Sequence, residues 1–158
     1  MSAPSRVAGV FLLLVVSTTA AGAADVFVVG GLSLSSTADD VRRLYPHSLI
    51  KDHHVEVLDQ DVRENIWAIE LPRAADSRRL RGFFERLTEH GATYPPCGQV
   101  LASIERKYGA PANVQEFAEE QAWNRRHIWP RGGEVLTLLC FRLGRGALSA
   151  SEITIAPR

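Results

Sequence analysis

The C-terminal third of the chain contains three segments typical of β-strands, joined by connections too short for a crossover. The strand candidates are residues 122–129, 134–143 and 147–156. Residues 130–133 and 144–146 connect them, and both connections contain glycine, as hairpin turns do. Strands joined in this way must pair antiparallel, because a parallel connection needs a dozen residues or more. The chain is therefore predicted to build an antiparallel sheet.

Three helices are predicted ahead of these strands. Thr37 and Asp40 have the spacing of a capping box, and Pro46 would end the short helix that they begin. A central helix is predicted over residues 76–91, and a third helix ends at Gly109. The apolar residues at helical spacing are Leu80, Phe83, Phe84 and Leu87 in the central helix, and Val100, Leu101, Ile104 and Tyr108 in the third.

The first half also contains strand candidates, at residues 48–58 and 65–71, and residues 116–121 fit either a helix or a strand. Together these elements predict an α+β fold, with an antiparallel sheet and helices packed on one face of it. The order of elements also allows two tandem helix-plus-hairpin repeats, residues 31–91 and 92–158.

The N-terminus has the three parts of a secretory signal peptide: a positive charge, an apolar run at residues 7–16, and small residues after it. We expect cleavage after Ala23 or Ala24, so that residues 1–24 are a cleavable signal peptide and residues 25–158 a single domain. The apolar run is about half the length that a bilayer-spanning helix needs. The mature chain is therefore expected in the periplasm or outside the cell, without a transmembrane segment.

The chain has two cysteines, Cys97 and Cys140. An even number of cysteines in an exported protein predicts a structural disulfide, and their wide separation excludes a C-x-x-C redox site. Closing this loop of roughly 44 residues would stabilise the fold by about 4 kcal/mol in the chain-entropy model.

The composition is that of an ordinary globular domain, with 46% hydrophobic and 23% charged residues. The formal net charge of +0 argues against a nucleic-acid partner. Gly30-Gly31 and Gly132-Gly133 are too short to cradle a phosphate, and no other cofactor motif is present in the sequence. We therefore expect no cofactor.

Two similar helix endings, Leu44-Tyr45-Pro46 and Tyr108-Gly109-Ala110-Pro111, each precede strands that contain tryptophan. This order resembles the tandem α/β repeat of small periplasmic proteins, namely the BamE-type outer-membrane assembly proteins and the β-lactamase-inhibitor-protein fold, over residues 31–157. The BamE type is a lipoprotein, whereas this chain has no lipid-bearing cysteine at its expected cleavage site. The resemblance implies a binding module without an active site, with another envelope or secreted protein as its partner.

One group of residues has the right chemistry for zinc binding or for acid and base catalysis: Asp52, His53, His54, Asp59 and Asp61. Adjacent residues on a strand point to opposite faces, however, so His53 and His54 could share one metal ion only if this segment were a loop. We therefore predict a polar strand or loop here and no metal site.

The candidate binding residues lie on the strand at 122–129. Trp123, Arg125, His127 and Trp129 alternate along it and would line one face. They could form a partner surface, since Trp and Arg are enriched at hot spots, or the tryptophans could pack beneath a helix. Arg125 and His127 are costly to bury, which predicts that this face is partly exposed. Trp67, in contrast, alternates with apolar residues and is predicted to lie in the core.

These observations favour a non-enzymatic binding or inhibitory module that acts through a sheet face. An envelope-maintenance or structural protein is the first alternative. A histidine-dependent hydrolase is the second, and it would require His53, His54 and His127 to surround one cavity. The sequence has no G-x-S-x-G motif to supply a serine nucleophile.

Overall fold

The structure, a computed structural model, describes residues 26–51, 54–56, 68–70, 79–119 and 121–158 of the chain. It contains helices α1 (Ala38–Leu44) and α2 (Cys97–Tyr108) among these residues. The strands are β1 (Leu49–Lys51), β2 (His54–Glu56), β3 (Ala68–Glu70), β4 (Leu80–Phe83), β5 (Arg86–Thr88), β6 (Gly91–Thr93), β7 (Asn113–Glu119), β8 (Ala122–Arg131), β9 (Glu134–Leu143) and β10 (Ser149–Pro157).

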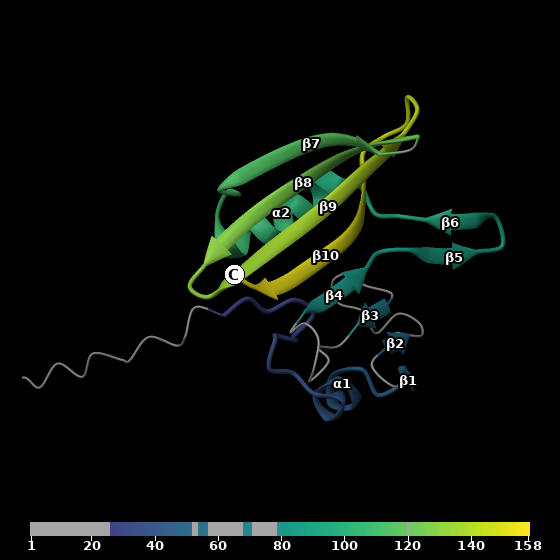
Figure 1. The fold of residues 1–158 in the computed structure, drawn as a ribbon. Helices are drawn as coiled ribbons and strands as arrows, with labels where there is room; N and C mark the ends of the chain where they lie inside the picture. Colours follow the sequence, from purple (N-terminus) through teal and green to yellow (C-terminus); the bar gives the residue numbers. More distant parts are fainter. Residues whose placement is uncertain (1–25, 52–53, 57–67, 71–78, 120) are drawn as a thin grey trace, which may run out of the picture.

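Eight of these strands form one sheet in the order β1-β2-β3-β4-β10-β9-β8-β7, and all its neighbours pair antiparallel. Strands β5 and β6 pair only with each other, as a hairpin that extends away from the main sheet (Figure 1). The predicted antiparallel sheet and α+β class are confirmed. The described part of the chain holds more strand and fewer helices than predicted.

The chain has two similarly ordered parts. Helix α1 precedes the antiparallel series β1 to β4, and α2 precedes the series β7 to β10, with β4 and β10 joined at the centre of the sheet. Each helix is thus followed by four strands rather than by one hairpin. The boundary between the predicted halves, 31–91 and 92–158, falls inside β6, so the β5–β6 hairpin connects the two parts.

Helix α1 begins and ends where the sequence predicts. The Thr37 side chain accepts from the backbone N–H of Asp40, and the Asp40 side chain accepts from the backbone N–H of Thr37, so the capping box is complete. The backbone N–H and the hydroxyl of Thr37 both donate to the Asp40 carboxylate and lower its pKa, and Arg43 lowers it further. The helix ends at Leu44, two residues before Pro46, and Val41 buries its apolar side.

The central helix predicted over residues 76–91 is wrong. Among its described residues, Leu80–Phe83 form β4, which is hydrogen-bonded between β3 and β10. Leu80 and Phe84 are buried and lie four residues apart, a spacing that fits one helix face and equally one strand face. Leu87 is 79% exposed on the β5–β6 hairpin. The apparent helical periodicity therefore joined residues of two different strands, since Leu80 is buried in β4 and Leu87 is exposed in β5.

Other predicted strands are confirmed with changed bounds. The candidate at 48–58 contains two short strands, β1 and β2, because the chain reverses between Lys51 and His54. The candidate at 65–71 contains β3, and the ambiguous segment at 116–121 overlaps β7. Some predicted site and core residues lie outside the described residues, namely Asp52, His53, Asp59, Asp61 and Trp67.

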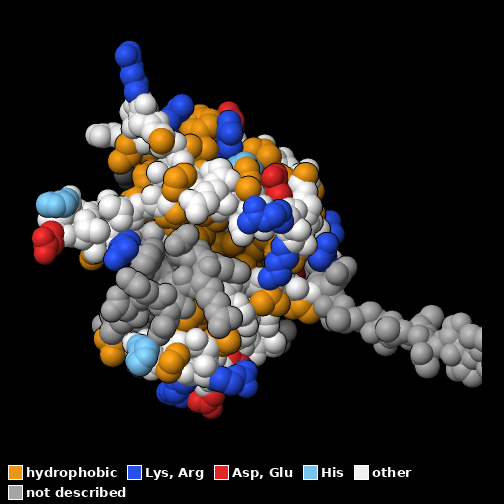
Figure 2. All heavy atoms as spheres, turned by 180° about the vertical axis from the view of Figure 1, so that it is seen from behind, with side chains coloured by type: hydrophobic (Ala, Val, Ile, Leu, Met, Phe, Trp, Pro, Cys, Tyr) orange, Lys and Arg blue, Asp and Glu red, His pale blue; other side chains and the backbone are white. Residues whose placement is uncertain are grey.

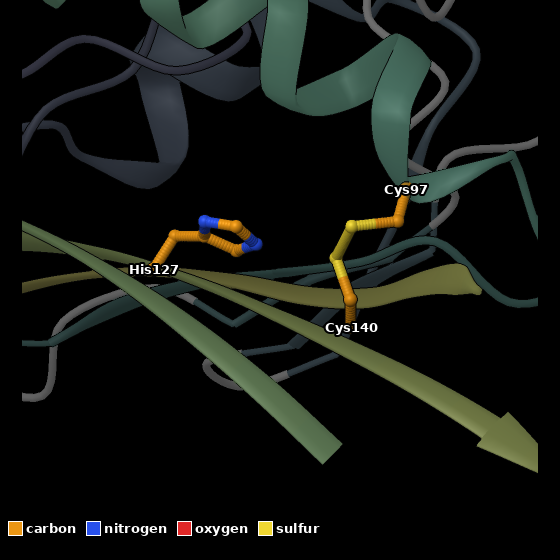
Figure 3. A group of neighbouring side chains, drawn as sticks. All are labelled: Cys97, His127 and Cys140. Atoms are coloured by element: carbon orange, nitrogen blue, oxygen red, sulfur yellow. A yellow bond between two sulfur atoms is a disulfide. The ribbon is translucent and has the colours of Figure 1, made fainter. Parts of the chain in front are cut away.

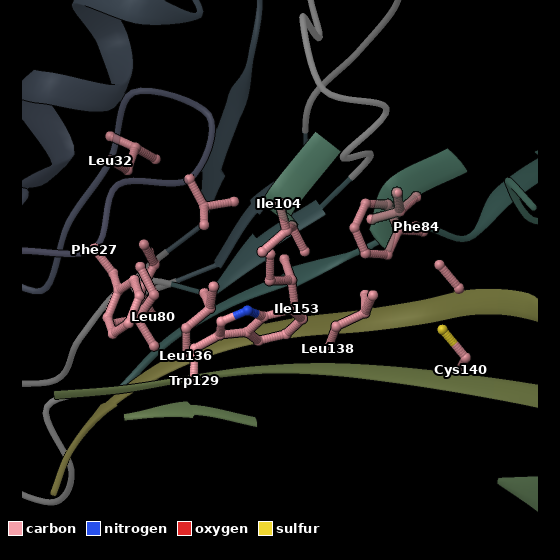
Figure 4. Packing of buried hydrophobic residues seen from close by; sticks show 14 of the residues in the cluster. Phe27, Leu32, Leu80, Phe84, Ile104, Trp129, Leu136, Leu138, Cys140 and Ile153 are labelled. Atoms are coloured by element: carbon pink, nitrogen blue, oxygen red, sulfur yellow. The ribbon is translucent and has the colours of Figure 1, made fainter. Parts of the chain in front are cut away.

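Helix α2 covers one face of the second half of the sheet and lies behind the strands in Figure 1. Its buried residues, Cys97, Val100 and Ile104, recur at helical spacing and face the strands. Figure 4 shows Ile104 above Trp129, Leu136 and Ile153 of the sheet. We call the strand face beneath α2 the inner face and the opposite one the outer face.

The first described residues belong to this core. Phe27 is fully buried and packs edge-on against Tyr108, with 5.0 Å between the ring centroids. The chain then turns at Gly30 and Gly31, whose φ angles of 57° and 78° are those of a two-residue hairpin turn that glycine adopts without strain. Gly30 and Gly31 thus form a tight turn.

Candidate functional site

Strand β8 places the four predicted binding residues on the inner face. In the β8–β9 register, Trp123 lies opposite Arg142, Arg125 opposite Cys140, His127 opposite Leu138, and Trp129 opposite Leu136. Directly opposed residues of an antiparallel pair project to the same side. Because Cys140 is bonded to Cys97 of α2, this side is the one that the helix covers. The predicted alternation is therefore present, and the face is the helix-covered one.

Two of the four residues are buried beneath α2. Trp129 is 3% exposed, and its indole Nε1 donates to the carbonyl oxygen of Gly109 at the end of the helix, over 2.8 Å. His127 is 4% exposed and stacks on Trp129 with 6.2 Å between ring centroids. The expectation that Trp129 belongs to an exposed surface is thus wrong. Helix α2, rather than solvent, covers this half of β8, and the buried indole N–H finds a hydrogen-bond partner at the end of the helix.

The other two residues lie beyond the start of α2 and remain partly exposed. The guanidinium carbons of Arg125 and Arg142 lie 5.0 Å and 4.7 Å from the centroid of the Trp123 ring. Arg125 also donates from Nε and Nη2 to Oε1 of Glu116, over 3.0 Å and 2.7 Å. We call Glu116, Trp123, Arg125 and Arg142 the Trp123 cluster. It combines a flat aromatic surface with three charged groups at the sheet surface.

The two arginines of the cluster differ in their pairing. Glu116 neutralises Arg125, and these side chains are 49% and 37% exposed. Arg142 forms no ion pair with any described residue, and its Nε is buried without a hydrogen-bond partner. A guanidinium donates in a planar fork that matches a carboxylate. The cluster therefore has one cation whose charge no described carboxylate neutralises.

Arg81 and Glu152 form an ion pair on the outer face of the sheet. Arg81 donates from Nε and Nη2 to the two carboxylate oxygens of Glu152, over 3.0 Å and 2.7 Å. Burial alone would raise the pKa of Glu152, but the hydrogen bonds from Arg81 and Thr154 lower it. The Glu152 carboxylate therefore stays ionised, and Arg81 and Thr154 already donate to it. The charges of the Arg81–Glu152 pair are therefore less available to a binding partner than the charge of Arg142.

Sequence reasoning missed Arg142 and Glu116. The signal that could have found Arg142 is the Gly132-Gly133 turn, because a two-residue turn fixes the register of its hairpin. That register pairs Trp123 with Arg142. Glu116 could not be found in this way, since the segment containing it was predicted as either helix or strand.

Comparison of this chain with protein-family models, with curated proteins and with solved structures found no match.

A second group of chemically reactive side chains lies beneath the start of α2. The predicted disulfide between Cys97 and Cys140 is present, with 5.9 Å between the Cα atoms, and His127 lies beside it (Figure 3). Neither ring nitrogen of His127 has a hydrogen-bond partner. Burial lowers the pKa of His127, and the positive charge of Arg125 lowers it further. The imidazole is therefore held neutral next to the two sulfur atoms.

The surface behind the sheet of Figure 1 is shown in Figure 2, where basic side chains are prominent and hydrophobic side chains are exposed between them. Neither described helix is long and apolar enough to cross a membrane. Of the histidines named for a hydrolase, His53 lies outside the described residues, and only the backbone of His54 is described.

Proposed function

We propose that this chain is an exported, non-enzymatic binding module that contacts another envelope or secreted protein through the Trp123 cluster. The observation that carries this proposal is the partly exposed Trp123 ring beside Arg142, a cation without an ion pair among the described residues. Trp and Arg are the residue types that most often dominate binding energy in protein interfaces. A partner carboxylate on Arg142, next to an apolar group on the Trp123 ring, would use both features.

The neighbouring strand favours a protein partner over a small molecule. Glu116 belongs to β7, which is the last strand of the sheet and has no neighbour on its outer side among the described strands. An unpaired strand edge presents backbone donors and acceptors to an extended segment of another chain. The Trp123 cluster lies beside this edge, so one acidic, extended segment could contact both.

Export is supported by the position of the first buried residues. Phe27 is fully buried, and the backbone N–H of Val28 donates to the Tyr108 hydroxyl over 2.8 Å. The first residues that the structure describes are thus already part of the core, close after the expected cleavage site at Ala23 or Ala24. The Cys97–Cys140 disulfide is compatible with an oxidising compartment, the periplasm or the extracellular medium.

Export is tested by mass spectrometry of the protein from its native host. The expected N-terminus is Ala24 or Asp25. A mature protein that keeps Met1 would contradict the signal peptide.

Binding is tested by capture from an envelope extract with a tagged protein that comprises residues 25–158. Arg142→Glu is expected to abolish capture of the partner, because it places a carboxylate where the partner's carboxylate would bind. The matched control is Arg126→Glu, because Arg126 lies on the neighbouring strand β8, its guanidinium carbon lies 5.0 Å from the Phe117 ring centroid, and it belongs to the outer face. Equal loss of capture by both variants, or equal capture by both, would reject the Trp123 cluster as the binding surface.

The described residues give little support to a hydrolase. His127 is buried, and the two sulfur atoms beside it are bonded to each other, so neither is a nucleophile in this form. An envelope-maintenance role would be favoured over specific binding if the wild-type protein captured no partner while its deletion altered the cell envelope.

A further inference from the structure

Three potential metal ligands come together from three different elements. Cys97 is the first residue of α2, Cys140 lies in β9, and His127 lies in β8. Their ligand atoms all lie within 4.8 Å of one another, and all three residues are buried (Figure 3). Sequence spacing does not group His127 with the two cysteines, because it lies 30 residues from Cys97 and 13 from Cys140. Only the sheet register and the position of α2 bring them together.

His127 is not explained by the disulfide form alone. Its Nδ1 and Nε2 are both buried without a hydrogen-bond partner, although buried polar atoms are nearly always paired. One ring nitrogen of His127 lies within 4.8 Å of both sulfur atoms. A neutral imidazole with a vacant nitrogen is the form in which histidine binds a metal. The unpaired nitrogen therefore points to a ligand that the reduced form of the chain could hold.

We propose that the reduced form of this chain binds one Zn²⁺ ion through the thiolates of Cys97 and Cys140 and a ring nitrogen of His127. Two thiolates and one imidazole are a known ligand set for zinc, with water as the fourth ligand. Tetrahedral bonds of about 2.3 Å to sulfur and about 2.0 Å to nitrogen place the ligand atoms roughly 3.5 Å apart. The three ligand atoms lie within 4.8 Å of one another, so side-chain rotations after reduction of the disulfide would complete the site.

Zinc and the disulfide exclude each other. Formation of the site needs a dithiol reductant, which gives two electrons and two protons to the Cys97–Cys140 bond and itself becomes a disulfide. Zn²⁺ then displaces the two thiol protons and binds the thiolates. Cys97 is the first residue of α2, where the positive end of the helix favours the thiolate. The chain would thus hold zinc only in a reducing environment and release it when the disulfide forms.

The first experiment uses untagged protein, so that no added histidines bind metal. The protein is reduced with a phosphine until two thiols per chain react with a thiol reagent, and Co²⁺ is then added as a spectroscopic probe. We expect one Co²⁺ per chain, with thiolate-to-cobalt charge-transfer absorption that one equivalent of Zn²⁺ removes. The oxidised protein should show no such absorption. Reduced wild-type protein without this absorption would overturn the proposal.

The second experiment identifies the nitrogen ligand. His127→Asn should weaken zinc binding at least about 100-fold, more than the loss of a residue that only supports a ligand. His90→Asn is the matched control, because His90 is exposed in the β5–β6 turn and should leave the affinity unchanged. Wild-type affinity in His127→Asn would remove His127 from the site. Should that variant fail to fold, X-ray absorption of the wild-type zinc form decides the question: two sulfur ligands with no histidine nitrogen would contradict the proposal.

Discussion

Replacing Trp129 by alanine should destabilise the domain severely. Trp129 is 3% exposed beneath α2, where it packs against Leu136 and donates to the carbonyl of Gly109 at the end of the helix. Truncating a buried tryptophan to alanine costs about 3 to 5 kcal/mol, because apolar contacts are lost and a cavity remains. At about 2 to 4 °C per kcal/mol for a domain of this length, the thermal midpoint should fall by about 6 to 20 °C.

The matched variant is Trp123→Ala, six residues earlier on the same strand face. Trp123 is only partly buried, and it contacts the guanidinium groups of Arg125 and Arg142. Each such contact contributes about 0.5 to 1 kcal/mol at an exposed site. The expected loss is therefore about 1 to 2 kcal/mol. Chemical denaturation followed by circular dichroism measures both variants. Equal losses for Trp123→Ala and Trp129→Ala would refute the division of this face into a covered and an exposed part.

Three further outcomes are expected. Burial lowers the pKa of His127 below its usual 6.5, so the unfolded chain binds a proton that the folded chain does not. The free energy of unfolding should therefore fall as the pH drops below about 6.5. His127→Gln should reduce this dependence when denaturation is measured between about pH 8 and pH 5. Replacing both Cys97 and Cys140 by serine should lower the free energy of unfolding by about 4 kcal/mol, and an unchanged midpoint would contradict a stabilising disulfide. Gly31→Ala should cost about 1 to 2 kcal/mol, because φ is +78° and the new Cβ would lie 3.1 Å from a leucine methyl group, whereas Gly98→Ala in α2 should be neutral or stabilising by up to about 1 kcal/mol.

The parts of the fold that were predictable from sequence are those fixed by local chemistry. The turn at Gly132-Gly133 fixes where β8 ends and β9 begins, and the Thr37–Asp40 capping box fixes the start of α1. The Cys97–Cys140 bond was predictable because two cysteines allow only one pairing. The central helix was mispredicted because a spacing of four residues, as between Leu80 and Phe84, belongs to both periodicities. Pairing with β3 on one side and with β10, which is distant in sequence, on the other decided in favour of the strand.

The candidate site was predictable only in part, because alternation shows which residues share a face but not how much of that face a helix covers. Helix α2 has 12 residues and is about 18 Å long, whereas the ten residues of β8 span about 33 Å. The helix can therefore cover little more than half of the strand. Its first residue, Cys97, is tied to Cys140, which lies opposite Arg125, and its end is tied to Trp129. The two ties place the helix over one end of the strand, so the length of α2 and the position of the disulfide together leave Trp123 accessible to a partner.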